Sequence, residues 1–188
     1  KAMIFAAGLG TRLKPITDSI PKALVPINDK PLLQHVIEKL ISSGFNELII
    51  NVHHFPKQII NFLKKNNNFG IRIEVSDERE LLLDTGGGLK KVKWFFDDGK
   101  PFLVHNVDIL SNIDLKSLYN EHSRTGAMAT LAVSQRETFR YFLFDDDLKL
   151  RGWKNKKTGE IKPSDLRKPD LFNELAFSGI QILSPSVF

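Results

Sequence analysis

Short apolar runs alternate with amphipathic segments along the first two thirds of this chain. The runs predict buried strands, while the amphipathic segments repeat apolar residues at helical spacing, as do Leu33, Val36, Ile37 and Leu40. Strands are expected at 2–7, 47–52, 71–76 and 101–106, and helices at 32–41, 56–65, 89–96 and 114–124. Such alternation is typical of a mostly parallel sheet with helices on both faces, so we predict an α/β fold, a Rossmann-like three-layer sandwich.

The pattern changes in the last third of the chain. Apolar segments at 128–134, 140–144, 148–153 and 174–183 predict neighbouring strands, with the acidic run 145–147 in a turn. The polar stretch 154–168 has the composition of a mobile loop. We therefore expect an antiparallel or mixed lobe that covers one edge of the sheet, which makes the sheet as a whole mixed.

Composition indicates one soluble domain. The chain has 188 residues, of which 41% are hydrophobic and 26% charged, enough to bury one core. It has no cysteine, which excludes disulfides and thiolate metal sites and is compatible with the cytosol. No run approaches the roughly 18 apolar residues of a membrane span, and no signal-peptide pattern opens the sequence. We predict a cytoplasmic protein with no membrane partner.

The net charge of +5 raises the question of nucleic-acid binding. The lysines are dispersed, however, with small clusters such as Lys64-Lys65 and Lys154-Lys156-Lys157. A nucleic-acid surface more often has a basic stripe interleaved with stacking aromatic residues. We interpret the lysines as solvated surface and predict no nucleic-acid partner.

A glycine loop with two spaced cations follows the first predicted strand. Gly8 and Gly10 let the backbone turn sharply and approach a ligand, and successive N–H groups in such a turn form a nest for anions. Arg12 adds a forked donor suited to phosphate, and Lys22 adds a compact point charge. The combination suits a polyphosphate such as a nucleoside triphosphate.

Two common phosphate motifs do not describe this loop. The dinucleotide fingerprint requires a third glycine where Leu13 stands, and the Walker pattern requires lysine directly after its last glycine. Two glycines separated by one residue after a strand are a weak signal by themselves. A plain turn with solvated basic residues therefore remains an alternative at this point.

The longer string around the loop resembles the signature of the sugar-phosphate nucleotidyltransferases, also called nucleotide-sugar pyrophosphorylases. The matching residues are Ala6 to Leu13, Pro15, Thr17, Pro21, Lys22 and Pro26. Asp84 to Gly88 and Phe177 to Ile180 resemble the branch of N-acetylmuramate-1-phosphate uridylyltransferases and mannose-1-phosphate guanylyltransferases. The resemblance covers nearly the whole chain. It implies a GT-A-like nucleotidyltransferase fold and one catalytic domain over 1–188, with a nucleotide part at about 1–125 and a sugar part at about 126–188.

The resemblance also implies a reaction. A sugar-1-phosphate oxygen attacks the α-phosphorus of a nucleoside triphosphate in line, and pyrophosphate leaves. Arg12 and Lys22 are the expected catalytic cations, Arg12 at the β and γ phosphates and Lys22 at the α-phosphate and the incoming phosphate. The expected nucleotide contacts are Ala6, Ala7, Gly8, Gly10, Thr11, Arg12, Thr85, Gly86 and Gly87.

Strand ends carry the remaining candidates, because ligands of open α/β sheets bind there. Asp108, just after the strand at 101–106, is expected to hold Mg²⁺, which takes carboxylate, phosphate and water oxygens. The resemblance implies sugar-phosphate contacts at Asn155, Ser178 and Gly179, and Asn106, at the end of the same strand as Asp108, is a further expected sugar-phosphate contact. Glu78 and Glu80 either accept from a base edge or are surface carboxylates, and we favour the surface.

The chain departs from the family in one respect. Relatives carry a second metal-binding aspartate beyond Phe177 to Ile180, and the sequence ends at Phe188 before any such residue, so we expect a C-terminally truncated domain. Two alternatives remain open. One is a nucleotide- or sugar-phosphate-binding regulatory domain with impaired turnover, and the other is a phosphocholine cytidylyltransferase, which shares the loop. The base and the sugar are not predicted.

Overall fold

The computed structural model describes residues 1–188, which divide into two compact units. The first unit holds Lys1–Thr130 and Ile180–Phe188, and the second holds Leu131–Gly179. Two strands, β7 (Ala129–Ser134) and β11 (Asn173–Leu183), contribute residues to both units.

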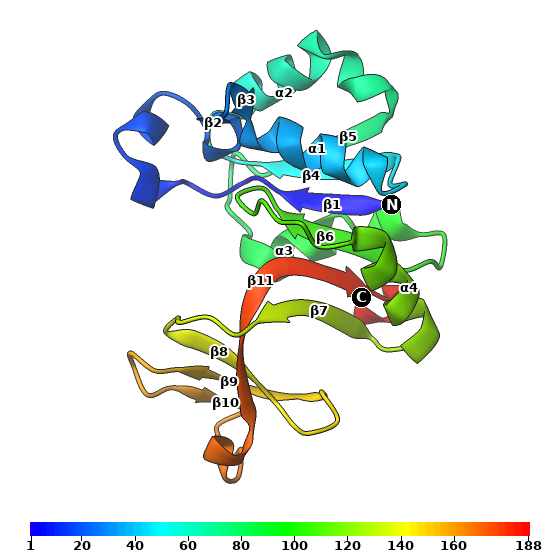
Figure 1. Cartoon of the computed structure of the whole chain (residues 1–188). Coiled ribbons are helices and arrows are strands. Elements are labelled where there is room, and N and C mark those ends of the chain that lie inside the picture. Colours follow the sequence, from blue (N-terminus) through cyan, green and yellow to red (C-terminus); the bar gives the residue numbers. More distant parts are fainter. The chain divides into compact units, whose positions relative to one another are not determined.

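A mostly parallel sheet forms the centre of the first unit (Figure 1). Its parallel strands, in spatial order, are β6 (Phe102–Asn106), β1 (Ala2–Phe5), β4 (Glu47–Val52) and β5 (Arg72–Asp77). The last residues of β11 run antiparallel to β6, with Ile180 opposite His105. Leu48, Ile49 and Ile50 are completely buried, as expected of a parallel strand covered on both faces. The predicted α/β class with a mixed, mostly parallel sheet is confirmed.

Four α-helices accompany these strands: α1 (Leu32–Ser42), α2 (Pro56–Lys65), α3 (Asp84–Lys91) and α4 (Leu115–Thr125). Helix α4 begins where the Asp114 carboxylate accepts hydrogen bonds from the N–H groups of Lys116 and Ser117, each at 3.0 Å. It ends at Gly126, whose φ of 61° is the left-handed conformation that closes a helix. None of the helices is long and apolar enough to cross a membrane.

Helical segments cover both faces of this sheet. Neighbouring residues of a strand point to opposite faces, so Val104 and His105 of β6 lie on different sides. Val104 packs with Phe95 and Phe96, which lie in a 3₁₀ turn at Lys93–Phe96. On the other face, His105 lines a cavity together with Val36 of α1. The first unit therefore has the predicted three layers.

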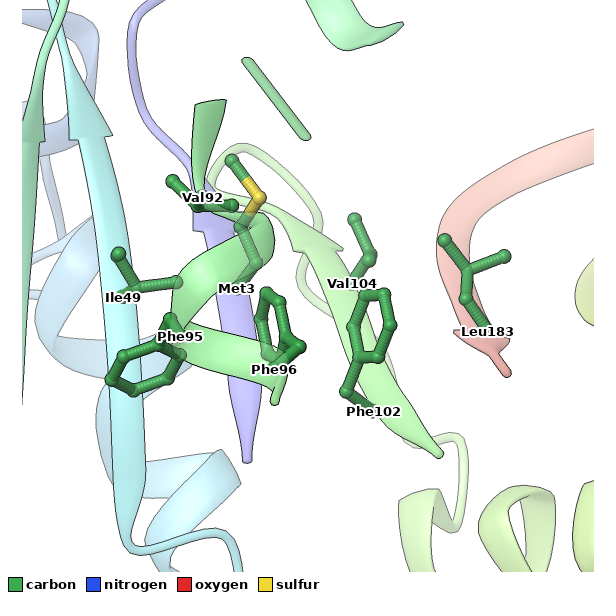
Figure 2. Packing of buried hydrophobic residues seen from close by; sticks show 8 residues of the cluster. All are labelled: Met3, Ile49, Val92, Phe95, Phe96, Phe102, Val104 and Leu183. Carbon is green, nitrogen blue, oxygen red and sulfur yellow. The ribbon is translucent and has the colours of Figure 1, made fainter. Parts of the chain in front are cut away.

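An aromatic cluster closes the core beneath α3. Figure 2 shows Phe95 and Phe96 over Met3 and Ile49, with Phe102 beside Phe96. The rings of Phe96 and Phe102 are stacked, with centroids 3.9 Å apart. This packing anchors the segment after α3 on the sheet, and so fixes the C-terminal end of that helix.

The second unit is antiparallel. Its strands β8 (Arg140–Phe144), β9 (Leu150–Asn155) and β10 (Ile161–Lys162) pair in order, and β8 also pairs with the first residues of β11. The predicted mobile loop at 154–168 is wrong in part. Lys154 pairs with Ile161 across a β9–β10 hairpin, and this backbone pairing is compatible with the polar side chains that suggested a loop.

The start of α3 also differs from the prediction. A helix is predicted at 89–96, but α3 begins earlier and spans Asp84–Lys91, so Gly86, Gly87 and Gly88 lie inside it. Neither Asp84 nor Thr85 caps it, because the preceding residue is Leu83 and no side chain makes a capping hydrogen bond. Glycine favours a turn because its backbone is conformationally free, but Gly88 lies in a helix, where close packing against Glu78 leaves no room for a side chain.

Short elements fill the long connection between β1 and α1. The 3₁₀ turns Thr11–Leu13, Ile16–Asp18 and Lys22–Leu24 are followed by the two-residue strands β2 (Pro26–Ile27) and β3 (Lys30–Pro31), which pair with each other. Further 3₁₀ turns lie at Asn67–Gly70, Pro169–Leu171 and Pro185–Val187. The connection is thus an ordered loop that carries both predicted cations.

Candidate functional site

The carboxyl ends of the parallel strands meet at one edge of the first unit's sheet. The glycine loop leaves β1 there, Asn51 lies near the end of β4, and Asn106 and Asp108 lie at the end of β6. This is the edge at which open α/β sheets bind ligands. Two cavities open at it.

Both cavities are lined by Gly8, Lys22 and Asp108. The first, which we call the strand-end cavity, has a volume of about 230 Å³ and is also lined by Ala7, Asn51, Asp84, Thr85 and Asn106. The second, the glycine-loop cavity, has a volume of about 720 Å³ and is also lined by Gly10, Thr11, Arg12 and an apolar wall that includes Val25 and Leu32. Six of the predicted nucleotide contacts therefore line one cavity or the other: Ala7, Gly8, Gly10, Thr11, Arg12 and Thr85.

Gly10 is required by the conformation of the loop. Its φ is 66°, and an added Cβ would lie 2.8 Å from Cγ2 of Thr17 and 3.1 Å from Cβ of Lys22. The buried Thr17 hydroxyl donates to the Gly10 carbonyl at 2.9 Å, and this hydrogen bond stabilises the turn. Gly8, by contrast, has no atom within 4 Å of where its Cβ would be, so space for a ligand is left beside it.

Lys22 and Asp108 form an ion pair where the two cavities meet. The Lys22 ammonium donates to Oδ2 of Asp108, and the two side chains are 18% and 30% exposed. The residues are far apart in sequence and are brought together because β1, which the Lys22 loop follows, pairs in parallel with β6, which Asp108 follows. Arg12 forms no ion pair and is exposed on the wall of the glycine-loop cavity, so its guanidinium is free for an anion.

His105 helps to fix the backbone at this edge and adds no charge to it. It is buried on β6, and burial lowers the pKa of its imidazole below the ordinary value. Its Nδ1 lies 2.8 Å from the carbonyl oxygen of Asn106, an acceptor, so Nδ1 carries the proton and donates. The neutral ring thus fixes the carbonyl of Asn106 without adding a cation beside Asp108.

The remaining predicted nucleotide contacts lie apart from the cavity walls. Ala6 is buried, and its N–H donates to Oδ1 of Asn51 at 2.8 Å, so it is already used within the protein. Gly86 and Gly87 lie in the first turn of α3, where Gly86 is exposed and an added Cβ at Gly87 would lie 3.0 Å from Cβ of Leu83.

Three predicted sugar-phosphate contacts, Asn155, Ser178 and Gly179, belong to the second unit. The side chain of Asn155 accepts from the N–H of Lys157 at 3.0 Å, within the turn between β9 and β10. Gly179 has a φ of 75°, which favours glycine at that point of β11. Asn106, the fourth predicted contact, lines the strand-end cavity in the first unit.

Sequence reasoning missed a buried polar pair beside the strand-end cavity. Nδ2 of Asn51 donates to Oε1 of Glu78 at 2.9 Å, and each residue is only 2% exposed. The interpretation of Glu78 as a surface carboxylate is wrong, because its carboxylate is buried against Asn51 and Gly88. One signal was present in the sequence: Asn51 interrupts the apolar run Leu48-Ile49-Ile50 and Val52, and a polar residue inside a buried strand needs a partner.

Gly88 packs directly on this pair, so a larger residue at this position should destabilise the fold. An added Cβ would lie 3.0 Å from Oε1 of Glu78 and 3.3 Å from Nδ2 of Asn51. We expect Gly88→Ala to lower the free energy of unfolding by about 1–3 kcal/mol, because the neighbours must move. Gly86→Ala in the same helix is the control, since no atom lies within 4 Å of where the added Cβ would be. Equal unfolding curves in urea for the two variants would contradict the packing argument.

Comparison with known proteins identifies the family of this chain. The sequence profile of the family described as nucleotidyl transferase matches residues 1–149. A UTP–glucose-1-phosphate uridylyltransferase from Synechocystis is 38% identical over 142 residues, which are 70% of this chain and 36% of that protein. Mannose-1-phosphate guanylyltransferase 1 from Arabidopsis thaliana is 33% identical over 192 residues, covering 100% of this chain and 50% of that protein.

A solved structure shares the fold. The structure of HddC from Yersinia pseudotuberculosis complexed with GMP-PN superposes with a TM-score of 0.76 and 25% identity, over 99% of this chain and 77% of that one. This chain spans between about a third and half of the length of the two curated relatives. The resemblance first drawn from the glycine loop is confirmed by a profile match that spans residues 1–149, and the chain belongs to the nucleotidyl transferase family.

Proposed function

We propose that this chain joins a nucleoside triphosphate to a sugar-1-phosphate, giving a nucleotide sugar and pyrophosphate. The observation that carries the proposal is the Lys22–Asp108 pair at the junction of two cavities, beside an open glycine loop. A cation suited to phosphate and a carboxylate suited to a metal thus lie at one point. The names of the two curated relatives describe transfer of a uridylyl group to glucose-1-phosphate and of a guanylyl group to mannose-1-phosphate.

The glycine-loop cavity is the proposed place of the β and γ phosphates. Gly8, Gly10 and Thr11 line it, and Arg12 is exposed on its wall without an ion pair. The strand-end cavity is the proposed place of the nucleoside, with Thr85 on its wall. Gly86 and Gly87 are kept as proposed contacts for the base, through the exposed first turn of α3.

Asp108 fits a divalent cation, and we propose Mg²⁺. Its carboxylate supplies the hard oxygen that Mg²⁺ prefers, and Asp84 provides a second carboxylate on the wall of the same cavity. Mg²⁺ usually takes one or two carboxylates and completes its shell with phosphate and water oxygens. When bound, it would lower the charge repulsion between the nucleotide and the incoming phosphate.

The protein's own groups then act by position and charge. In the proposed reaction the sugar-phosphate oxygen bonds to the α-phosphorus, the bond from that phosphorus to the bridging oxygen breaks, and pyrophosphate takes the electron pair. We propose that Lys22 stabilises charge on the α-phosphate and that Arg12 holds the leaving pyrophosphate. No protein nucleophile is needed, so catalysis rests on orientation.

The acceptor side is proposed for the second part of the chain. We propose one catalytic domain with nucleotide residues within about 1–125 and sugar residues within about 126–188, in which Asn106, Asn155, Ser178 and Gly179 contact the sugar phosphate. A cytoplasmic location is part of the proposal, because nucleoside triphosphates are available there, and the product would supply polysaccharide synthesis for the cell envelope.

Pyrophosphate release tests the function directly. We expect release when Mg²⁺ and one of ATP, CTP, GTP or UTP are combined with the correct sugar-1-phosphate from a panel that includes the glucose, mannose and N-acetylmuramate compounds. CTP with phosphocholine tests the cytidylyltransferase alternative in the same assay. Nucleotide binding without release under every combination would overturn the enzyme proposal and favour a regulatory binding domain. The same assay identifies the base.

A further inference from the structure

One buried pair connects both proposed halves of the nucleotide site. Oδ1 of Asn51 accepts from the N–H of Ala6 at 2.8 Å, and Nδ2 donates to Oε1 of Glu78 at 2.9 Å. The other carboxylate oxygen, Oε2, accepts from the N–H of Leu83 at 3.4 Å. Asn51 and Glu78 are each 2% exposed, so these bonds are shielded from competing water.

The two ends of this chain of hydrogen bonds lie in different parts of the site. Ala6 directly precedes Ala7 and Gly8, where the backbone turns into the glycine loop. Leu83 directly precedes α3, whose first turn includes Thr85 on the wall of the strand-end cavity. Asn51 lines that same cavity. The loop proposed to bind phosphates and the segment proposed to bind the base are therefore tied to one another through Asn51 and Glu78.

We propose that Asn51 and Glu78 are positioning residues that hold the glycine loop and the start of α3 at the separation a nucleoside triphosphate requires. The inference rests on the proposed function, because it takes these two segments as the phosphate and base sides of one ligand. It assigns the pair a role in nucleotide affinity rather than contact with the reacting atoms.

The chemistry of the two side chains explains why these residue types occur here. An amide has one acceptor and one donor group, so Asn51 can accept from Ala6 and donate to Glu78 at once. A carboxylate has two acceptor oxygens, so Glu78 can serve Asn51 and Leu83 together. Glutamine at 78 has a single acceptor oxygen, and its NH₂ group would face one of these two donors. An unpaired buried donor costs more than an exposed one.

Packing limits how the pair can adjust. The backbone of Gly88 lies so close that an added Cβ would be 3.0 Å from Glu78 and 3.3 Å from Asn51. Nδ1 of His53 lies 2.7 Å from the carbonyl oxygen of Glu78, which fixes its backbone as well. A change in either partner is therefore expected to move the loop or α3 rather than to be absorbed locally.

Binding of UTP and GTP with Mg²⁺, measured by calorimetry, tests the inference without relying on turnover. For the nucleotide that the protein binds, we expect Glu78→Gln to raise Kd about tenfold, the effect of one unpaired buried donor. The affinity for inorganic tripolyphosphate should fall less, because that ligand contacts only the glycine loop. Glu80→Gln, an exposed glutamate two residues away, is the matched control and should bind as the unchanged protein does.

A second variant gives a readout that a purely structural role would not produce. In Asn51→Asp, two carboxylates face each other at pH 8 and repel. At lower pH, once the pair has taken up one proton, the carboxyl group introduced at position 51 can accept from Ala6 and donate to Glu78 as asparagine does. The nucleotide affinity of this variant should therefore recover at low pH, relative to the unchanged protein, while that of Asn51→Ala should not.

Comparison with the unchanged protein corrects for other ionisable groups that lie nearby. His53 contacts Glu78, and Lys22, Asp84 and Asp108 line the same cavity, but all four are present in every variant. Asn120→Asp, at an exposed position of α4, controls for the added charge.

The outcomes separate this inference from the proposed function. If the unchanged protein binds no nucleoside triphosphate, the proposed function fails and the inference fails with it. If the unchanged protein binds but Glu78→Gln binds equally well, only the role of the pair is overturned. Loss of affinity in Asn51→Asp with no recovery at low pH would also overturn it, because the hydrogen-bond pattern would then not be the cause. If Asn51→Asp does not fold, judged by circular dichroism, Glu78→Gln with its tripolyphosphate comparison decides.

Discussion

Replacing Lys22 by alanine is expected to lower turnover at saturating substrates by about a hundredfold to a thousandfold while the protein stays folded. The ammonium lies at the junction of the two cavities, where it would meet the charge that develops on the α-phosphate, and one such group contributes about this much to catalysis. Its loss removes only one partly exposed ion pair from the fold. Steady-state pyrophosphate release gives kcat, and thermal unfolding shows whether the fold is kept.

Lys57→Ala is the matched control, since Lys57 is an exposed residue of α2 and lines neither cavity. It should leave kcat and KM unchanged. Full turnover of Lys22→Ala at saturating substrates would remove Lys22 from the proposed mechanism, whereas equal losses in both variants would point to a general effect of surface charge.

Asp108→Asn is expected to lower turnover by at least about a hundredfold, through weaker metal binding. A neutral amide oxygen is a poorer ligand for Mg²⁺ than a carboxylate, although it still accepts a hydrogen bond from Lys22, so the fold should be retained. Manganese, used as a paramagnetic substitute and measured by electron paramagnetic resonance, reports metal affinity separately from activity.

The two variants should differ in metal affinity. In the absence of nucleotide, Lys22→Ala should bind manganese more tightly than the unchanged protein, because the ammonium no longer competes for the Asp108 carboxylate. Asp108→Asn should bind it more weakly. Asp146→Asn, in an exposed turn, is the control. Unchanged manganese affinity in Asp108→Asn would exclude Asp108 as a ligand.

The elements that the sequence predicted best are those whose pattern depends on local burial. Strand β4 and helix α2 have the predicted bounds, because a buried parallel strand is apolar throughout and an amphipathic helix repeats its apolar residues. Helix α3 was displaced in the prediction because three consecutive glycines favour a turn locally. Strand β9 overlaps the strand predicted at 148–153, but its pairing with β10 was missed because the residues around β10 are polar, and backbone pairing leaves little trace in composition.

The sequence by itself determined the α/β class and the family, and it predicted a glycine loop with two cations as the candidate phosphate site. These follow from periodicity and from a long local motif, both of which lie within short stretches of chain. Only the tertiary structure decided that Lys22 pairs with Asp108 and that Glu78 is buried against Asn51. Those contacts join residues that are distant along the chain, and what brings them together is the order of the strands in the sheet, which no local pattern specifies.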